Sequence, residues 1–359
     1  MWEPILREFE TLATTGVAGY RYFLLMAKGD LEIRANCWGL PHHNSSSPCS
    51  ECWCNRSTVP FTDLGSSAGW RAYGELSRAQ FLGRCRHPAH PLVTSQFAWR
   101  YFFPVDMMHV VDCNGLTGII ASSVLRVLIQ RDNRLGRNQA ARLATINTLL
   151  DDYYARNPGI SKMPPLRLQN FVDGGGWYRL HGKTVKSAST RALSPFLVEV
   201  AELYYAELPD GHPRALYNRL VLRAVRGLAR FYEMLYKECH VVLQDRELSE
   251  LKRVVQRLLI AVQELRDLSR QDGVLAWGVV PKTHYFAHLP TLASYVNPRY
   301  CQNYHEEGHV GVSTRIWARS ANGRYRGTIQ KTFLMKRLTS IFLRLEELSL
   351  ADAHLRVQG

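Results

Sequence analysis

Two cysteines in the first third of the chain have the spacing of metal ligands. Cys49 and Cys52 form a Cys-x-x-Cys pair, which supplies two thiolates and hence half of a tetrahedral structural zinc site. A zinc deaminase would need a His-x-Glu or Cys-x-Glu motif upstream, and none precedes Cys49. We therefore expect either a zinc site or buried free thiols. The side chains available to complete the zinc site are Cys37, Cys54, Cys85, His87, His90 and His109.

A second set of residues could bind divalent cations through carboxylate oxygens. Asp30 closes a strand-like run, Asp106 and His109 form an Asp-x-x-His pair, and Glu306-Glu307 precede an expected helix. A carboxylate at a strand end, another at a helix start and a nearby His can hold Mg²⁺ or Mn²⁺ for phosphoryl transfer. Isolated acids at such places are also common as helix caps and turn formers, so a structural role for each stays open.

The C-terminal part of the chain is strongly basic. No acidic residue occurs from Gly308 through Leu345, and Trp317, Tyr325 and Phe333 lie among the cations. Basic side chains neutralise phosphates and aromatic faces stack on bases, so this pattern predicts DNA binding; a solvated helix face with its aromatics in the core is the alternative. The candidate nucleic-acid-binding residues are Arg315, Arg319, Arg324, Arg326, Lys331, Lys336 and Arg337, with Arg344 beyond them.

The composition of the 359 residues fits a folded protein with a polyanionic partner. The chain is 46% hydrophobic, carries 45 Lys and Arg against 31 Asp and Glu, and has a net charge of +14, which favours a polyanionic partner such as nucleic acid or an acidic membrane surface. The acidic first ten residues exclude a signal peptide. The apolar stretch from Gly115 to Ile129 is too short to span a bilayer and contains Arg126. We expect a nuclear or cytoplasmic protein that is neither secreted nor a membrane protein.

Three segments of the chain differ in amino-acid composition, and these differences suggest which elements position the candidate residues. Residues 1–112 are rich in Cys, His and aromatics, residues 113–279 read as helical, and residues 280–359 hold the final acids and the basic segment. Apolar residues at helical spacing predict two long helices. Their faces are Leu216, Leu220, Ala224, Leu228, Phe231 and Leu235, and Leu248, Leu251, Val255, Leu258, Val262 and Leu265. Strands are expected at Tyr20 to Ala27 and in the β-prone run Gln96 to Val105.

An ordered set of motifs resembles a family of mobile-element proteins. The matching segments run through nearly the whole chain: FLLMAKGDLE (23–32), PCSECWCNRSTVPFTDLGSSAGWR (48–71), PVDMMHVVDCNG (104–115), PKTHYFAHL (281–289) and NPRYCQNYHEEGHVGVSTRIWARS (297–320). Together they resemble the transposase-derived proteins of dinoflagellates, which are similar to the Plavaka, KDZ and CACTA-like cut-and-paste transposases. Each motif is moderately specific, and their order carries the resemblance.

The resemblance implies an RNase H-like core in which three acids bind two Mg²⁺ or Mn²⁺ ions for DNA strand transfer. Asp30 matches the second acid, Glu307 the last acid with Glu306 as its alternative, and Asp106-x-x-His109 a Cys/Asp-x-x-His motif of such families. The helical stretch between them would be an insertion, and Cys49 and Cys52 would lie in the family's Cys-x-x-Cys patch.

One departure from the family pattern limits what the resemblance implies. Only 29 residues precede Asp30, and Glu3, Glu8 and Glu10 lie in or beside an expected helix, so the first acid and its strand are missing. We therefore expect an α+β, predominantly α-helical chain: a partial RNase H-like core with a large helical insertion. It would be a DNA-binding but catalytically incomplete remnant of a metal-dependent transposase, either a homo-oligomer or completed by another chain. The alternative is a helical interaction or scaffold protein, with Asp30, Asp106 and Glu307 far apart. An intact metal-dependent nuclease is a third reading.

Overall fold

The computed structural model describes most of the chain up to Tyr304. The described residues are 2–15, 26–72, 76–86, 90–95, 100–171, 176–182, 185–206, 208–237 and 240–304. Residues Met1–Asn303 form one compact unit. Two hydrophobic clusters stabilise this unit: a large one that runs through the long helices and a smaller one around Trp38, Phe81 and Phe103.

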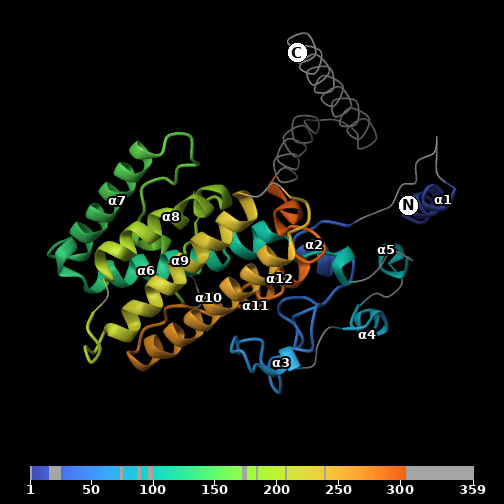
Figure 1. The fold of residues 1–359 in the computed structure, drawn as a ribbon, viewed down its shortest axis with the longest axis horizontal. Coiled ribbons are helices and arrows are strands. Elements are labelled where there is room, and N and C mark those ends of the chain that lie inside the picture. The colour runs from blue at the N-terminus through green and yellow to red at the C-terminus, as the bar shows by residue number, and fades with distance from the viewer. Residues whose placement is uncertain are drawn as a thin grey trace, which may run out of the picture. The chain divides into compact units, whose positions relative to one another are not determined.

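The long helices pack against one another as a bundle (Figure 1). Their bounds are α6 Leu116–Arg131, α7 Gln139–Arg156, α8 Ser187–Tyr204, α9 Ala215–Lys237 and α10 Asp245–Gln271. The most extensive contact joins α9 to α10, while α8 contacts both α9 and α6. The two helices predicted from apolar spacing are thus confirmed. Their apolar stripes face each other because residues three and four apart share one face of a helix.

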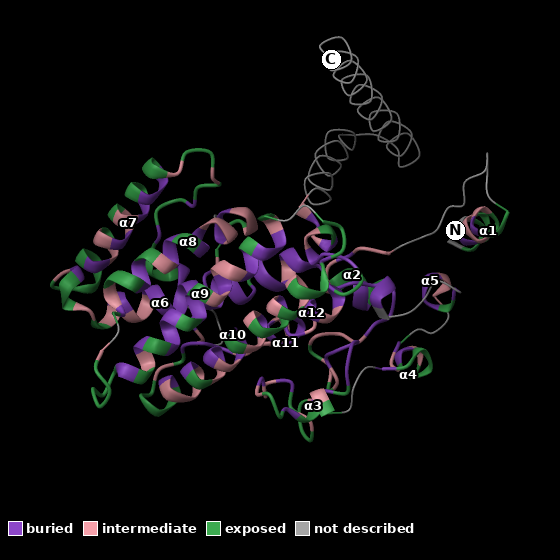
Figure 2. Cartoon of the chain, viewed as in Figure 1, coloured by how far each residue is buried: buried purple, intermediate pink, exposed green. Residues whose placement is uncertain are grey.

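Helix α6 forms the centre of the bundle, and twelve of its sixteen residues are buried (Figure 2). Together with the preceding turn, the stretch Met108–Arg131 is long and apolar enough to cross a membrane by length and composition. However, 78% of its most apolar window is buried inside the protein. Partner side chains explain that burial: Thr117 and Tyr232 hydrogen-bond at 2.7 Å, and Ser122 donates to the Phe171 carbonyl at 2.7 Å. Its apolarity therefore reflects a core position.

Short helices and loops surround one end of the bundle and carry the conspicuous cysteines and histidines. On the N-terminal side these are α1 Trp2–Thr14, α2 Leu31–Asn36, α3 Gly69–Ala72, α4 Arg78–Gly83 and α5 Pro91–Thr94. After α10 the chain returns through α11 Pro281–Phe286 and α12 Leu289–Leu292. Single turns occur at η1 Arg100–Phe102, η2 Met108–Asp112, η3 Asn133–Leu135, η4 Leu168–Asn170 and η5 Pro298–Cys301, of which η2 is a π-helical turn.

The expected α+β fold with a partial RNase H-like core is wrong, although the expectation of a mostly helical chain is right. The described residues contain no β-sheet; isolated bridge residues occur at Asn55, Pro60 and Tyr178. The expected strand at 20–27 lies mainly outside the described residues. In the second β-prone run, the described part forms the 3₁₀ turn η1. Pro104 has no N–H to give to a sheet, which explains why aromatic content alone does not make a strand there.

Candidate metal centre

Four side chains from two distant parts of the chain converge on one point. The ligand atoms of Cys49, Cys52, His284 and His288 all lie within 4.8 Å of one another. The Sγ of Cys52 is 3.3 Å from Nε2 of His284, and the Sγ of Cys49 is 3.5 Å from Nε2 of His288. The two Nε2 atoms are 3.1 Å apart. The pairs come together although 232 residues separate Cys52 from His284.

These separations are close to those around a tetrahedral zinc ion. With Zn–S near 2.3 Å and Zn–N near 2.05 Å, tetrahedral angles place S and N about 3.6 Å apart and two N atoms about 3.3 Å apart. The structure has S–N separations of 3.3 and 3.5 Å and an N–N separation of 3.1 Å. The sequence spacing, Cys-x₂-Cys followed by His-x₃-His, also belongs to the common zinc patterns. The residues present therefore fit zinc.

Helical geometry places the two imidazoles side by side. Pro281 occupies the first turn of α11, where its missing N–H costs nothing and its fixed φ favours the helix. His284 lies in α11 and His288 in the turn that joins α11 to α12; because the backbone stays in the helical region between them, the two side chains lie on the same side. Between them, the buried hydroxyl of Tyr285 donates to the carbonyl of Pro48 at 2.7 Å. This bond connects the histidine helix directly to the loop that carries the cysteines.

Backbone amides orient the two sulfur atoms. The N–H of Glu51 donates to Sγ of Cys49 at 3.2 Å, and the N–H of Cys54 donates to Sγ of Cys52 at 3.5 Å. Hydrogen bonds to the charged form of a group favour that form, so these amides favour the thiolates that bind zinc. The loop thus presents both sulfurs with donors already in place.

A buried arginine holds the same loop from the other side. Nη2 of Arg34 donates to Oγ of Ser50 at 2.7 Å and pairs with the Glu51 carboxylate at 3.3 Å. Arg34 is 2% exposed and Glu51 6% exposed, so the ion pair is shielded from water. Arg84 adds a hydrogen bond to the Cys52 carbonyl. Losing one partner of such a pair would leave a buried charge, which is costly.

Aromatic rings close the site against solvent. The Trp70 ring lies 4.7 Å from the His284 ring in an edge-on arrangement and 5.4 Å from the His288 ring. The guanidinium of Arg71 stacks on the Trp70 ring, 4.2 Å from its centroid. Cys49, Cys52 and His284 are buried and His288 is partly buried. A closed set of four protein donors is typical of structural zinc sites rather than catalytic ones.

Burial and mutual charge shift the titration of these groups in the chain without metal. Burial raises the pKa of Cys49 and lowers that of His284 well below its usual value. Burial also acts to lower the pKa of His288, but the neighbouring Cys49 and Cys52 raise it well above the usual value. The two sulfurs thus favour positive charge at this point, and a bound cation would supply it.

Comparison with known proteins assigns no family to this site. No family model, no curated protein and no solved structure matches the chain. The chemistry of the site therefore rests on its own geometry.

A second His and Glu cluster does not fit a metal equally well. Glu32, His42 and His43 bring three ligand atoms within 4.8 Å. However, Nδ1 of His42 accepts the backbone N–H of Asn44 at 3.1 Å, so the proton of the neutral imidazole lies on Nε2. That nitrogen is 3.4 Å from the Glu32 carboxylate, as expected for an N–H donor. A metal-bound His instead gives its other N–H to an acceptor.

The carboxylates predicted to bind catalytic metal have structural partners. Asp30 caps α2: its Oδ1 accepts the Ile33 N–H at 2.7 Å. Asp106 is 2% exposed; its carboxylate accepts the N–H groups of Met108 at 3.0 Å and Asn303 at 3.1 Å, and it pairs with His109. The cap and the buried hydrogen bonds support the structural reading of these residues.

The charges of two of the predicted acids influence the buried Lys282, whose ammonium donates to the Cys113 carbonyl at 2.6 Å. Burial lowers the pKa of Lys282, and Asp106 and Asp30 are among the groups that act to raise it.

Glu306 and Glu307 lie outside the described residues, so their distance from Asp30 is untested. The predicted DNA-binding residues Arg315, Arg319, Arg324, Arg326, Lys331, Lys336 and Arg337 lie outside them as well.

The sequence analysis identified the cysteine half of the metal site and missed the histidine half. None of the six side chains considered as completing ligands is in the four-residue group. Cys54 comes nearest: it is buried, and a hydrogen bond with Cys49 is the largest influence that raises its pKa. The missed signal was the His-x₃-His spacing in the segment 281–289, which was noted only as part of a resemblance.

Proposed function

We propose that this chain is a zinc-stabilised helical binding module. Cys49 and Cys52 would supply two thiolates and His284 and His288 two neutral imidazoles to one zinc ion. The single observation that carries the proposal is the convergence of these four ligand atoms within 4.8 Å. The metal would link the loop after α2 to the α11–α12 segment. These two segments lie far apart in the sequence.

The composition of the donor set supports zinc over the other metals weighed here. Mg²⁺ and Mn²⁺ favour carboxylate, carbonyl and water oxygens, whereas a tetrahedral set of two sulfurs and two nitrogens is typical of zinc. The carboxylate nearest in sequence, Glu51, is committed to Arg34. With four protein donors, zinc would have no open position for a substrate or water, so the proposed role is structural.

Metal analysis of the 359-residue chain tests this proposal. We expect about one zinc per chain after purification in a zinc-free buffer, and less than a tenth of that in Cys49→Ser or His284→Ala. Cys37→Ser is the matched control, because Cys37 is an exposed thiol outside the group. Equal zinc content in the wild type and in the two site variants would refute the proposal.

DNA is the partner that we propose for this module, as part of a transposase-derived origin without nuclease activity. The net charge of +14 and the basic segment from Gly308 to Leu345 support it. The logarithm of a DNA-binding constant falls with the logarithm of salt by about 0.9 for each phosphate neutralised. We expect replacement of Arg315, Arg319 and Arg324 by Gln to reduce this slope by about two to three.

A control with three other arginines distinguishes the loss of phosphate contacts in the basic segment from a general loss of positive charge. Arg219, Arg226 and Arg230 of α9 form ion pairs with Asp210, Glu202 and Glu250. Their replacement by Gln removes the same number of cations but should leave the slope within experimental error. DNA retention that does not depend on salt, or equal losses in both triple variants, would contradict DNA binding through the basic segment.

A further inference from the structure

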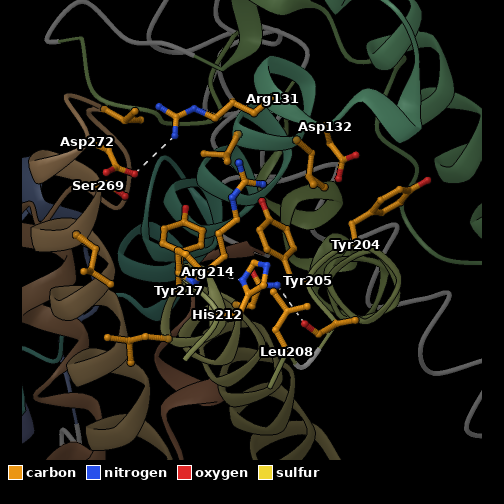
Figure 3. Close-up of a pocket in the computed structure, with 18 of the residues that line it drawn as sticks. Arg131, Asp132, Tyr204, Tyr205, Leu208, His212, Arg214, Tyr217, Ser269 and Asp272 are labelled. Carbon is orange, nitrogen blue, oxygen red and sulfur yellow. Dashed lines mark hydrogen bonds and ion pairs between the residues drawn. The ribbon is translucent and has the colours of Figure 1, made fainter. Parts of the chain in front are cut away.

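A cavity opens among the ends of four long helices, and none of the four proposed zinc ligands lines it. It has a volume of about 380 Å³ and lies among the last turns of α6, α8 and α10 and the first turn of α9. Figure 3 shows Arg214, Tyr205 and Tyr217 in its middle, with Arg131 and Asp272 on one side and Asp132 and Tyr204 on the other. This volume falls in the range of small-molecule sites, about 300 to 1,000 Å³.

Apolar side chains form part of the cavity wall, and the hydroxyl groups of Tyr205 and Tyr217 there already have partners. Leu128, Leu268 and the Tyr205 ring contribute to it. The Tyr205 hydroxyl donates to the Val124 carbonyl at 3.0 Å, and the Tyr217 hydroxyl accepts the indole N–H of Trp277 at 3.2 Å. Burial raises the pKa of Tyr205 well above its usual value, so this hydroxyl stays neutral. The wall therefore suits the apolar body of a ligand.

Most of the charged groups at the rim neutralise one another. Arg134 binds the Asp132 carboxylate through two nitrogens, at 3.0 and 2.6 Å, and also donates to the Tyr204 carbonyl. Arg131 pairs with Asp272 at 3.6 Å. These ion pairs shape the rim and leave little net charge.

Arg214 and His212 are two cavity-lining donors for which no ion pair is found among the described residues. Among the described residues, the Arg214 guanidinium forms no ion pair, although it lines the cavity. Nδ1 of His212 accepts the Arg214 backbone N–H at 3.1 Å, so Nε2 carries the ring proton in the neutral form and donates in either protonation state. A guanidinium and an imidazole N–H that line the same cavity are both donors suited to the oxygens of a carboxylate or phosphate.

We infer that this cavity binds a small amphiphilic oxyanion: an apolar, ring-sized body ending in one carboxylate or phosphate. The body would occupy the wall formed by Leu128, Leu268 and Tyr205, and the oxyanion would accept hydrogen bonds from Arg214 and His212. Because one cavity-lining guanidinium, that of Arg214, has no ion pair among the described residues, we expect the ligand to carry one anionic group. The inference is independent of the zinc site and of the DNA partner.

Calorimetric titration of the zinc-loaded full chain with matched probes tests the inference. The probes are naphthylacetate, its neutral isostere naphthylacetamide, naphthyl phosphate and acetate. We expect naphthylacetate to bind about five- to tenfold more tightly than the amide, the effect of a charge-assisted hydrogen bond at a partly exposed rim. Comparison with naphthyl phosphate tells which oxyanion the site prefers. Acetate should not compete, because it cannot use the apolar wall.

Two variants assign the preference to the cavity. Arg214→Gln should reduce the ratio of the carboxylate and amide affinities to about one, while Arg223→Gln should keep the wild-type ratio. Arg223 is an exposed arginine of α9 that does not line the cavity. Equal binding of the carboxylate and the amide by the wild type would overturn the inference. So would an unchanged ratio in Arg214→Gln, or competition by acetate as strong as that by naphthylacetate.

Discussion

Replacement of Cys52 by Ser should lower the stability of the chain by the free energy that zinc contributes. A metal that binds only the folded state stabilises it by about 2.7 kcal/mol at a hundredfold excess over Kd and by about 4.1 kcal/mol at a thousandfold excess. For a chain of this size, about 1 kcal/mol shifts Tm by roughly 2 to 4 °C. We therefore expect Cys52→Ser to melt about 5 to 15 °C below the wild type in a zinc-buffered solution. Serine keeps the size of the side chain, so lost packing contributes little.

Thermal unfolding followed by far-ultraviolet circular dichroism, with and without a chelator, isolates the metal contribution. The chelator should lower the Tm of the wild type to near that of Cys52→Ser and leave the variant unchanged. Cys37→Ser replaces an exposed thiol and should respond to the chelator as the wild type does. If the chelator leaves the wild-type Tm unchanged, or shifts Cys52→Ser by the same amount, zinc does not stabilise the fold through this site.

Three further substitutions test the contacts around the metal centre and the cap of α2. Asp30→Ala should lower the free energy of unfolding by about 1 kcal/mol in denaturant titration while Asp30→Asn keeps most of it, because Asn also caps helices; equal losses would contradict the cap. Arg34→Met should lower it by about 3 to 5 kcal/mol since it leaves Glu51 buried and unpaired, and Glu51→Gln in the same chain should restore part of the loss; no restoration would argue against the ion pair. Tyr285→Phe should cost about 1 to 3 kcal/mol by leaving the Pro48 carbonyl without its donor, and should speed zinc transfer to a chromogenic chelator; an unchanged transfer rate would mean that this bond does not hold the cysteine loop.

Local periodicity was enough to predict the long helices. In α9, the residues Leu220, Ala224, Leu228 and Phe231 repeat at helical spacing and are all buried. Leu216 belongs to the same stripe but is 48% exposed, because it lies at the open cavity at the end of the bundle. Periodicity identifies a helix and its inward face, whereas the burial of a particular residue depends on where the neighbouring helices end.

Residues next to short elements were harder to interpret. Asp30 follows a β-prone run, which suggested the end of a strand, but the residues after it form α2 and use its carboxylate as a cap. The same aspartate in the sequence fits both roles, and only the surrounding packing decides between them.

The histidine half of the metal centre could not be located by short-range reasoning. The Cys pair suggested ligands within about sixty residues, but the fold brings in His284 and His288 from beyond the whole helical bundle. The His-x₃-His spacing was visible, yet spacing alone does not say which distant pair faces it. The packing of α11 against the loop, including the bond between Tyr285 and Pro48, determines that choice.

X-ray absorption spectroscopy of the purified chain tests the proposed zinc ligation most directly. We predict a first shell of two sulfurs at about 2.3 Å and two nitrogens at about 2.0 to 2.1 Å, with the nitrogen contribution reduced in His288→Ala. A shell made of oxygen ligands, or one whose nitrogen content is unchanged in His288→Ala, would contradict the assignment of Cys49, Cys52, His284 and His288 as one zinc site.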